Sequence, residues 1–256
     1  MAVTGGVSGR DYTEQDIFTE LYPRMKEEPL FNRDDELVVP VRNTERPHYR
    51  RVGRASFLRR LGRAENNPTH DECVQNLYTK LCETQRRISI SSYIFADDGT
   101  REEQSLFATG HTSDYRWFRE ADARVAFDDD TYIQPDLAGR DANRFFPRAS
   151  CPNIIIEVIR THAPDFEAFA KLYELSLANS MIVFYFIGDG SLSSKLNHMK
   201  EEEGCLTLRV SHYMIGGQPY NNGKPILGLR DGEEVEHWHT FLSNSYFRQA
   251  KEKASA

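Results

Sequence analysis

The chain has 256 residues, of which 39% are hydrophobic and 28% are charged. This length and composition exclude a mainly disordered protein and allow a substantial buried core. The sequence contains no apolar run long enough to cross a membrane and no signal-peptide core at its N-terminus, so we expect a soluble, cytoplasmic protein with no membrane partner. The four cysteines have no CxxC spacing, which argues against a structural zinc site.

The net charge of −7 is unevenly distributed along the chain. The window from Arg42 to Arg63 contains eight arginines and one acid, Glu45, so it carries +7 and leaves −14 for the rest. Concentrated guanidinium groups bind phosphate even in an acidic protein, because salt screens distant charges beyond about 10 Å. The alternative is a solvated surface, or one that docks onto the acidic remainder. The residues expected to contact phosphate are Arg46, Arg50, Arg51, Arg54, Arg59, Arg60 and Arg63.

Residues 1–66, which include this arginine-rich segment, are predicted to be an N-terminal extension. A short helix is expected from Thr13 to Leu21, and prolines interrupt the chain after it. One or two helical turns are expected at 55–61.

Beyond the extension, the chain alternates between helical and strand patterns. A helix is expected at His70–Glu83, because apolar residues recur there at helical spacing after a capping-box pattern formed by Thr69 and Glu72. A second helix is expected from Pro164 to Asn179, between two apolar runs that are typical of buried strands. The predicted strands are 87–95, 123–127, 131–137, 154–160, 181–187 and 205–211, and a closing helix is expected at 236–251.

This order predicts the fold class. Two consecutive buried strands flanking a crossover helix are typical of an α/β protein. We expect a core of one helix, a mixed sheet of four to five strands and a crossover helix over residues 67–190, with residues 191–256 completing the same domain.

Two carboxylates in the predicted sheet indicate chemistry. Glu157 lies in the apolar run Ile154–Ile159, where an isolated ionised carboxylate is so costly that it needs a partner, a proton or a metal. Asp136 ends the preceding strand, and adjacent strands would bring the two carboxylates to about 5 Å from each other. Two acids this close favour a divalent cation, and oxygen ligands favour Mg²⁺ or Mn²⁺.

Each carboxylate alone also has a purely structural explanation. Asp136 would simply end a strand in a turn. Glu157 would pair with an arginine, for which the candidates are Arg140, Arg144 and Arg148.

The order of these features resembles the PD-(D/E)XK nuclease superfamily. Pro135 and Asp136 match the first half of its motif, and Glu157 matches the acidic residue of the second half. The chain is most similar to the branch around the competence protein CoiA, where an Arg-Pro-His segment precedes a helix opened by a histidine and the glutamate strand ends in Thr-His. Here these segments are Arg46–Arg50, Thr69–Glu72 and Glu157–His162.

The resemblance implies a restriction-endonuclease-like core and metal-dependent hydrolysis of DNA, in a phage, mobile-element or defence context. Asp136, Glu157 and the backbone carbonyl of Ile159 would hold Mg²⁺ or Mn²⁺. Glu72 is a candidate for one further contact to the metal or its ligands. An enzyme that cuts both strands commonly needs two active sites, so a homo-oligomer is also expected.

One position departs from the superfamily pattern. The motif lysine should stand two residues after the glutamate, and Ile159 occupies that position. Lys171 on the following helix or His162 at the strand end would then supply the base; Lys171 has the alternative of an exposed pair with Glu167. A catalytically degenerate protein that binds nucleic acid or a partner, or a structural subunit that reuses the fold, is the alternative function.

Overall fold

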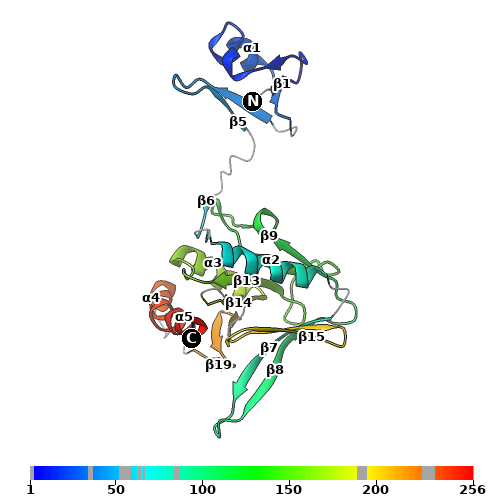
Figure 1. Ribbon diagram of the computed structural model, residues 1–256, viewed down its shortest axis with the longest axis vertical. Coiled ribbons are helices and arrows are strands. Elements are labelled where there is room, and N and C mark those ends of the chain that lie inside the picture. Colours follow the sequence, from blue (N-terminus) through cyan, green and yellow to red (C-terminus); the bar gives the residue numbers. More distant parts are fainter. Residues whose placement is uncertain are drawn as a thin grey trace. The chain divides into compact units, whose positions relative to one another are not determined.

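The structure, a computed structural model, describes residues 3–33, 37–51, 59–62, 65, 67–83, 87–188, 195–226 and 234–255. The predicted helical turns at 55–61 fall largely outside these residues, as do Arg54 and Arg63. The chain divides into two compact units, one of residues 1–59 with 128–130 and one of residues 60–127 with 131–256 (Figure 1).

The first unit is more than an extension, because it has its own sheet and core. Within the predicted helix over 13–21 the structure has a short 3₁₀-helix. A separate α-helix follows it, and Pro23 stands in the first turn of that helix, where proline is tolerated. The sheet has the order β2-β1-β3-β4-β5. The elements are β1 (Val3–Gly5), β2 (Asp11–Tyr12), η1 (Glu14–Phe18), α1 (Tyr22–Glu27), β3 (Leu30–Phe31), β4 (Leu37–Val41) and β5 (His48–Arg51). Buried side chains between them include Tyr12, Ile17, Met25 and Leu30.

The second unit is built on a seven-stranded mixed sheet, with the order β19-β18-β17-β14-β13-β12-β9. The strands are β9 (Tyr115–Arg119), β12 (Leu137–Asp141), β13 (Asn153–Ile159), β14 (Ser180–Phe186), β17 (His212–Ile215), β18 (Gln218–Asn221) and β19 (Lys224–Pro225). β13 runs parallel to β14, and α3 (Phe166–Leu177) connects them as a crossover helix. β12 pairs antiparallel with both β9 and β13. The protein is therefore mixed α/β, as the sequence predicts.

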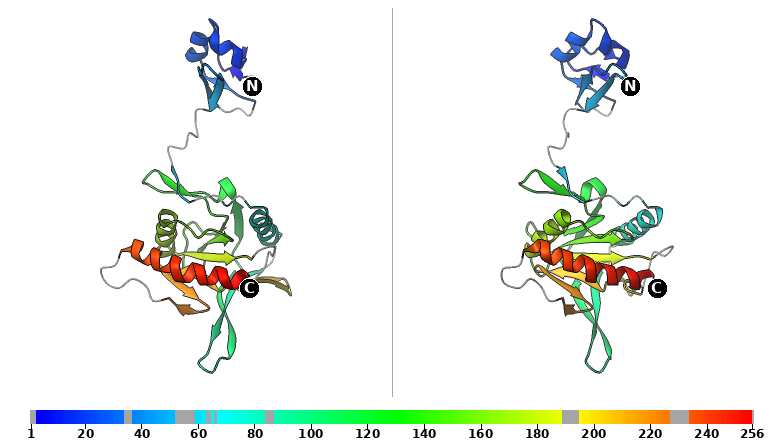
Figure 2. Two further views of the ribbon diagram at one scale, coloured as in Figure 1. Left: turned by 60° about the vertical axis from the view of Figure 1, so that its left-hand side comes forward. Right: turned by 90° about the vertical axis from the view of Figure 1, so that its left-hand side faces the viewer.

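Helices cover the two faces of this sheet (Figures 1 and 2). β13 is buried on both faces, since Ile154, Ile156 and Val158 pack in one cluster while Ile155 and Ile159 pack in another. The apolar run in the sequence predicts a buried strand of this kind. The first cluster contains α2 (Pro68–Cys82); the second contains α3 and a C-terminal helical segment made of α4 (Val235–Phe241), the π-helical η3 (Leu242–Phe247) and α5 (Arg248–Ser255).

Two smaller sheets complete the second unit. The four-stranded sheet has the order β15-β16-β7-β8, and a three-stranded sheet has the order β10-β11-β6. The strands are β6 (Arg59–Arg60), β7 (Arg87–Phe95), β8 (Arg101–Ala108), β10 (Val125–Ala126), β11 (Thr131–Ile133), β15 (His198–Glu202) and β16 (Cys205–Arg209), and η2 (Glu120–Ala123) is a 3₁₀-helix. In the described part of the chain, no helix has the length and apolar character needed to span a membrane.

Candidate functional site

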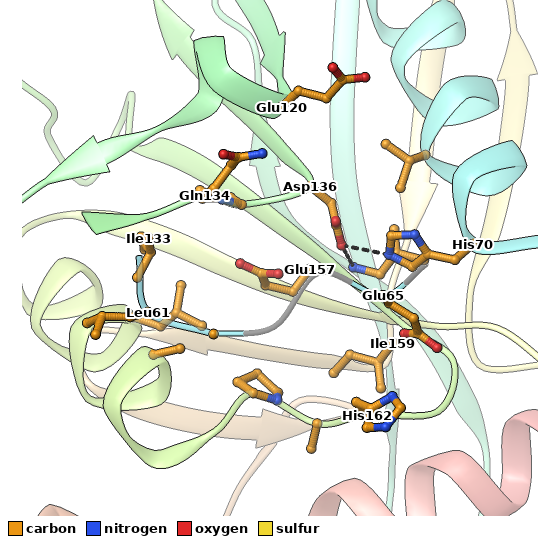
Figure 3. Close-up of a pocket in the computed structure, with 18 of the residues that line it drawn as sticks. Leu61, Glu65, His70, Glu120, Ile133, Gln134, Asp136, Glu157, Ile159 and His162 are labelled. Carbon is orange, nitrogen blue, oxygen red and sulfur yellow. Dashed lines mark hydrogen bonds and ion pairs between the residues drawn. The ribbon is translucent and has the colours of Figure 1, made fainter. Parts of the chain in front are cut away.

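Asp136 and Glu157 lie together where β12 begins. The register pairs Leu137 with Ile156, so the residue before Leu137 lies beside the residue after Ile156. The backbone N–H of Val158 donates a hydrogen bond of 2.8 Å to Oδ2 of Asp136, which fixes this carboxylate against the end of β13. Figure 3 shows both carboxylates directed into the same cavity. The structure therefore brings together the two acids that the sequence singles out.

The cavity has a volume of about 690 Å³ and belongs to the second unit. One part of its wall is apolar and is formed by β11, β13 and α3 around the partly buried Glu157. The other part is polar and is formed by the first turn of α2 and by the segments that follow β6 and β13. The apolar lining includes Leu61, Ile133, Ile159, Ala168 and Leu172, and the polar lining includes Arg60, Glu65, His70, Arg119, Gln134 and His162.

His70 is a basic group in contact with Asp136. It stands in the first turn of α2, where Asn67 caps the helix by accepting hydrogen bonds from the N–H groups of Thr69 and His70. Its Nε2 lies 3.2 Å from Oδ2 of Asp136, and its side chain is only 7% exposed. Burial lowers the pKa of this imidazole, but the hydrogen bond to Asp136 and the charge of that carboxylate outweigh it and raise the pKa to about 9. His70 is therefore protonated at neutral pH.

The surroundings of Glu157 favour the neutral form of its carboxyl, whereas those of His70 favour the charged form of its imidazole. Burial raises the pKa of its carboxyl well above the usual range, and the negative charge of Asp136 raises this pKa further. Arg60 on the cavity wall acts in the other direction. Arg140, Arg144 and Arg148, the arginines considered as partners for Glu157, do not line the cavity, so none of them explains this carboxylate.

A hydrogen-bonded chain orients His162 at the cavity wall. Glu65 accepts hydrogen bonds from the backbone N–H of Thr161, at 2.9 Å, and from the Thr161 hydroxyl. That hydroxyl has only one proton, so its oxygen accepts from Nδ1–H of His162, 2.6 Å away. In neutral His162 the Nε2 atom is then the unprotonated nitrogen, which is the atom that a general base requires.

Other predicted site residues lie elsewhere. Lys171 does not line the cavity; its Nζ is 3.1 Å from Glu174 and 4.7 Å from the centre of the Phe127 ring. The Ile159 carbonyl accepts a hydrogen bond of 3.0 Å from the N–H of Ile187 and therefore faces the β14 side of the strand. Glu72 is exposed on α2 and is also absent from the lining.

The predicted phosphate-binding arginines are divided between the two units. Arg46 and Arg50 are exposed in the first unit, and Arg59 and Arg60 form β6. Of these four residues, Arg60 lines the cavity. The side chain of Arg51, like residues 54 and 63, lies outside the described part of the chain.

The carboxylate pair fits an open magnesium site better than a closed metal cage. Among the described residues, no three His, Cys, Asp or Glu side chains form a metal-binding group. Mg²⁺ commonly keeps several water ligands and is held by one or two carboxylates together with substrate phosphates. Asp136 and Glu157 would be those carboxylates. The C=O of Val158 points to the same side of β13 as its N–H, toward β12, and it replaces the Ile159 carbonyl as the candidate backbone ligand.

Comparisons of the chain with protein-family models, with curated proteins and with solved structures gave no match.

His70 and Glu65 are the site residues that sequence reasoning missed. His70 appeared only as the histidine that opens a helix, and Glu65 carried no signal of its own. The contact between His70 and Asp136 spans 66 residues, and the contact between Glu65 and Thr161 spans 96.

Proposed function

We propose that this protein is a metal-dependent nuclease that hydrolyses phosphodiester bonds of DNA, and that the second unit has a restriction-endonuclease-like core. The order of its elements supports this proposal: α2 precedes β9, β12 and β13, which are adjacent in the sheet, and α3 then crosses over to β14. The observation that carries the proposal is the convergence of Asp136 and Glu157 in one cavity beside His70.

The chain's own residues would contribute in three ways. Asp136 and Glu157, with the Val158 carbonyl, would hold a divalent cation, which when bound supplies polarisation of the scissile phosphate and a lower pKa for water. His70 and the Val158 N–H fix the orientation of Asp136. His162, oriented through Thr161, would take the proton of the attacking water at Nε2.

Ile159 favours a second candidate function. It places an apolar side chain where the superfamily lysine would orient water and neutralise phosphate, and Lys171 does not line the cavity as a replacement. A protein that binds nucleic acid at this cavity without cutting it is therefore the alternative.

The test is an incubation of the protein with plasmid and linear DNA, with Mg²⁺ or Mn²⁺ and with a chelator. Cleavage should require the metal and should fall by at least about a hundredfold in Asp136→Asn and in Glu157→Gln, because each change removes a negatively charged ligand. Glu102→Gln is the matched control, since Glu102 is exposed on β8. Cleavage that persists in Asp136→Asn would disprove the nuclease proposal. Binding of DNA without cleavage under either metal would favour the alternative.

A further inference from the structure

The sheet face that carries Asp136 and Glu157 extends over β12 and β9, away from the cavity. In the antiparallel register Arg140 lies opposite Arg116, and Ala138 lies opposite Phe118. Residues opposite each other in an antiparallel pair point to the same face of a sheet. Ala138 also lies opposite Ile155, which shares a face with Glu157. We call the four residues Arg116, Phe118, Ala138 and Arg140 the outer strand face.

The outer strand face is open to solvent. Arg116 and Arg140 are exposed, and Phe118 and Ala138 are partly exposed. On this side of the sheet α3 packs against β14 and β17, further along the sheet. Arg140 follows Asp136 by four residues, so its Cα lies about 13 Å along the strand from that of Asp136.

The two arginines present cationic groups on this face. The Arg140 guanidinium stacks on the Phe118 ring at 4.4 Å from its centre, which holds the group in place and leaves its N–H edge available. Within the described part of the chain no carboxylate forms an ion pair with Arg140. Arg116 bonds Asp114 through Nε and one terminal nitrogen, and its side chain is 65% exposed with further N–H donors free for a second anion.

The loop after β12 adds two aromatic rings. Phe145 is 92% exposed and Phe146 is 70% exposed, and their ring centres lie 4.7 Å apart in an edge-to-face arrangement. Arg144 and Arg148 flank this pair in the sequence. Exposed aromatic side chains beside arginines are the combination that binds unpaired nucleobases, since rings stack on bases while guanidinium groups contact phosphates.

We propose that the outer strand face and this loop bind the nucleic-acid strand that leaves the cavity, with Arg116 and Arg140 contacting phosphates and with Phe145 and Phe146 stacking on unpaired bases. The inference rests on the proposed function, which supplies the strand at the cavity. It assigns the substrate class as nucleic acid with a single-stranded segment on the β12 side of the carboxylate pair. These residues are separate from the arginine window around Arg42–Arg63.

The test measures binding of the full chain to fluorescent single-stranded and double-stranded oligonucleotides by anisotropy, in chelator so that no cleavage occurs. Arg116→Ala/Arg140→Ala should weaken binding of both oligonucleotides. The slope of log affinity against log salt should decrease by about 1.8 for the duplex and by about 1.4 for the single strand, as expected for two lost phosphate contacts. Phe145→Ala/Phe146→Ala should weaken single-strand binding about tenfold and leave duplex binding nearly unchanged. Arg248→Ala, at an arginine that is 68% exposed on α5, is the control for general loss of charge.

The outcomes separate this inference from the nuclease proposal. If the unaltered protein binds and cleaves DNA while both double variants keep its affinity and salt slope, the strand path is wrong and the nuclease proposal stands. If the protein binds without cleaving and the variants lose affinity, the strand path stands and the nuclease proposal fails. Absence of any binding overturns the strand path, whereas the nuclease proposal is decided by the cleavage assay with metal. Equal competition by polyglutamate for the arginine-dependent binding would overturn the assignment to nucleic acid.

Discussion

Glu157 shows how a single residue in an apolar strand indicates a site. Its neighbours on β13 are buried hydrophobic residues. Its own carboxylate lines the cavity, close to the negative charge of Asp136. Burial and this charge both raise its pKa. The ionised Glu157 carboxylate destabilises the fold, and a bound cation would offset this cost because it would neutralise the charge of both carboxylates.

Glu157→Gln should therefore stabilise the protein at neutral pH. The folded state holds the Glu157 proton more tightly than the unfolded chain does, so the parent protein loses stability as the pH rises above the carboxyl's ordinary value of 4.5. We expect Glu157→Gln to raise the free energy of unfolding by about 1–3 kcal/mol at pH 7.5 and to have little effect at pH 4. Urea unfolding at the two pH values measures this, with Glu102→Gln as control. A loss of stability at pH 7.5 would contradict the expectation.

His70 gives the opposite dependence on pH. Its pKa is raised from 6.5 to about 9, so the stability that it contributes is fully present below pH 6.5 and is lost as the pH rises through 9. A shift of this size corresponds to about 3 kcal/mol. We expect His70→Gln to destabilise the protein by about this amount more at pH 6 than at pH 10. Unfolding at both pH values tests this, and His198→Gln, at an exposed position on β15, should show no such difference. A titration of His70 near 6.5 would disprove the proposed pairing.

The carboxylates were predictable from sequence for a reason that does not extend to the other site residues. Glu157 violates the pattern of a buried strand, which is a local signal. The sequence predicts that Asp136 ends a strand at 131–137, whereas it lies between β11 and β12, directly before the strand that pairs with β13; the predicted strand end is wrong, and the predicted adjacency of the two carboxylates is confirmed. Nothing local shows that the helix N-terminus would place His70 against Asp136, or that Glu65 would bond Thr161. Such contacts depend on packing between distant segments.

At the scale of elements, strong hydrophobic patterning in the sequence was sufficient to locate the helices and strands around the candidate site. The predicted helix at 70–83 is α2, and the predicted helix at 164–179 is α3. The predicted strands at 154–160 and 181–187 are β13 and β14. Every end of these four elements agrees with the prediction within two residues. β8 carried no usable signal, because its residues are largely exposed and show no alternation between polar and apolar. The strands of the first unit are only two to five residues long, too short for period two to be recognised.

Helix ends were predicted less well than helix interiors, and the start of α2 positions a residue of the candidate site. The sequence suggested Thr69 with Glu72 as a capping box, whereas Asn67 is the cap and Pro68 stands at the first helical position. Both Asn67 and a proline at this position favour a fixed helix start. The cap therefore also fixes the position of His70.

Asn67→Ala should destabilise α2 by about 1 kcal/mol, because two N–H groups of the first turn lose their acceptor. The pKa of His70 should also fall toward 6.5, since the first turn would hold the imidazole less firmly against Asp136. Thermal unfolding and NMR titration of His70 measure the two effects. Asn67→Asp, which keeps the acceptor, is the control and should resemble the parent protein. Unchanged stability in Asn67→Ala would show that the cap bonds are not important.

For the whole molecule, net charge alone is a poor guide to partners. The chain carries −7, but eight arginines fall in the window Arg42–Arg63 and two more lie on the outer strand face, while Asp136 and Glu157 are among the acids that line the cavity. The window itself is divided between the two units, with Arg46 and Arg50 in the first and Arg60 on the cavity wall in the second. An acidic protein can still bind a polyanion, since screening makes local charge decisive over about 10 Å.

Whether the first unit binds DNA can therefore be tested through its own arginines. Arg46 and Arg50 are exposed, so Arg46→Ala/Arg50→Ala should leave the free energy of unfolding within about 0.5 kcal/mol of the parent value. If they contact phosphates, affinity for duplex DNA should fall equally for all sequences, and the salt slope should decrease by about 1.8. Arg10→Ala/Arg24→Ala removes two cations from the same unit and is the matched control. Equal losses in the two double variants would mean that the effect is one of general charge, and an unchanged salt slope in Arg46→Ala/Arg50→Ala would exclude these two arginines from the phosphate contacts.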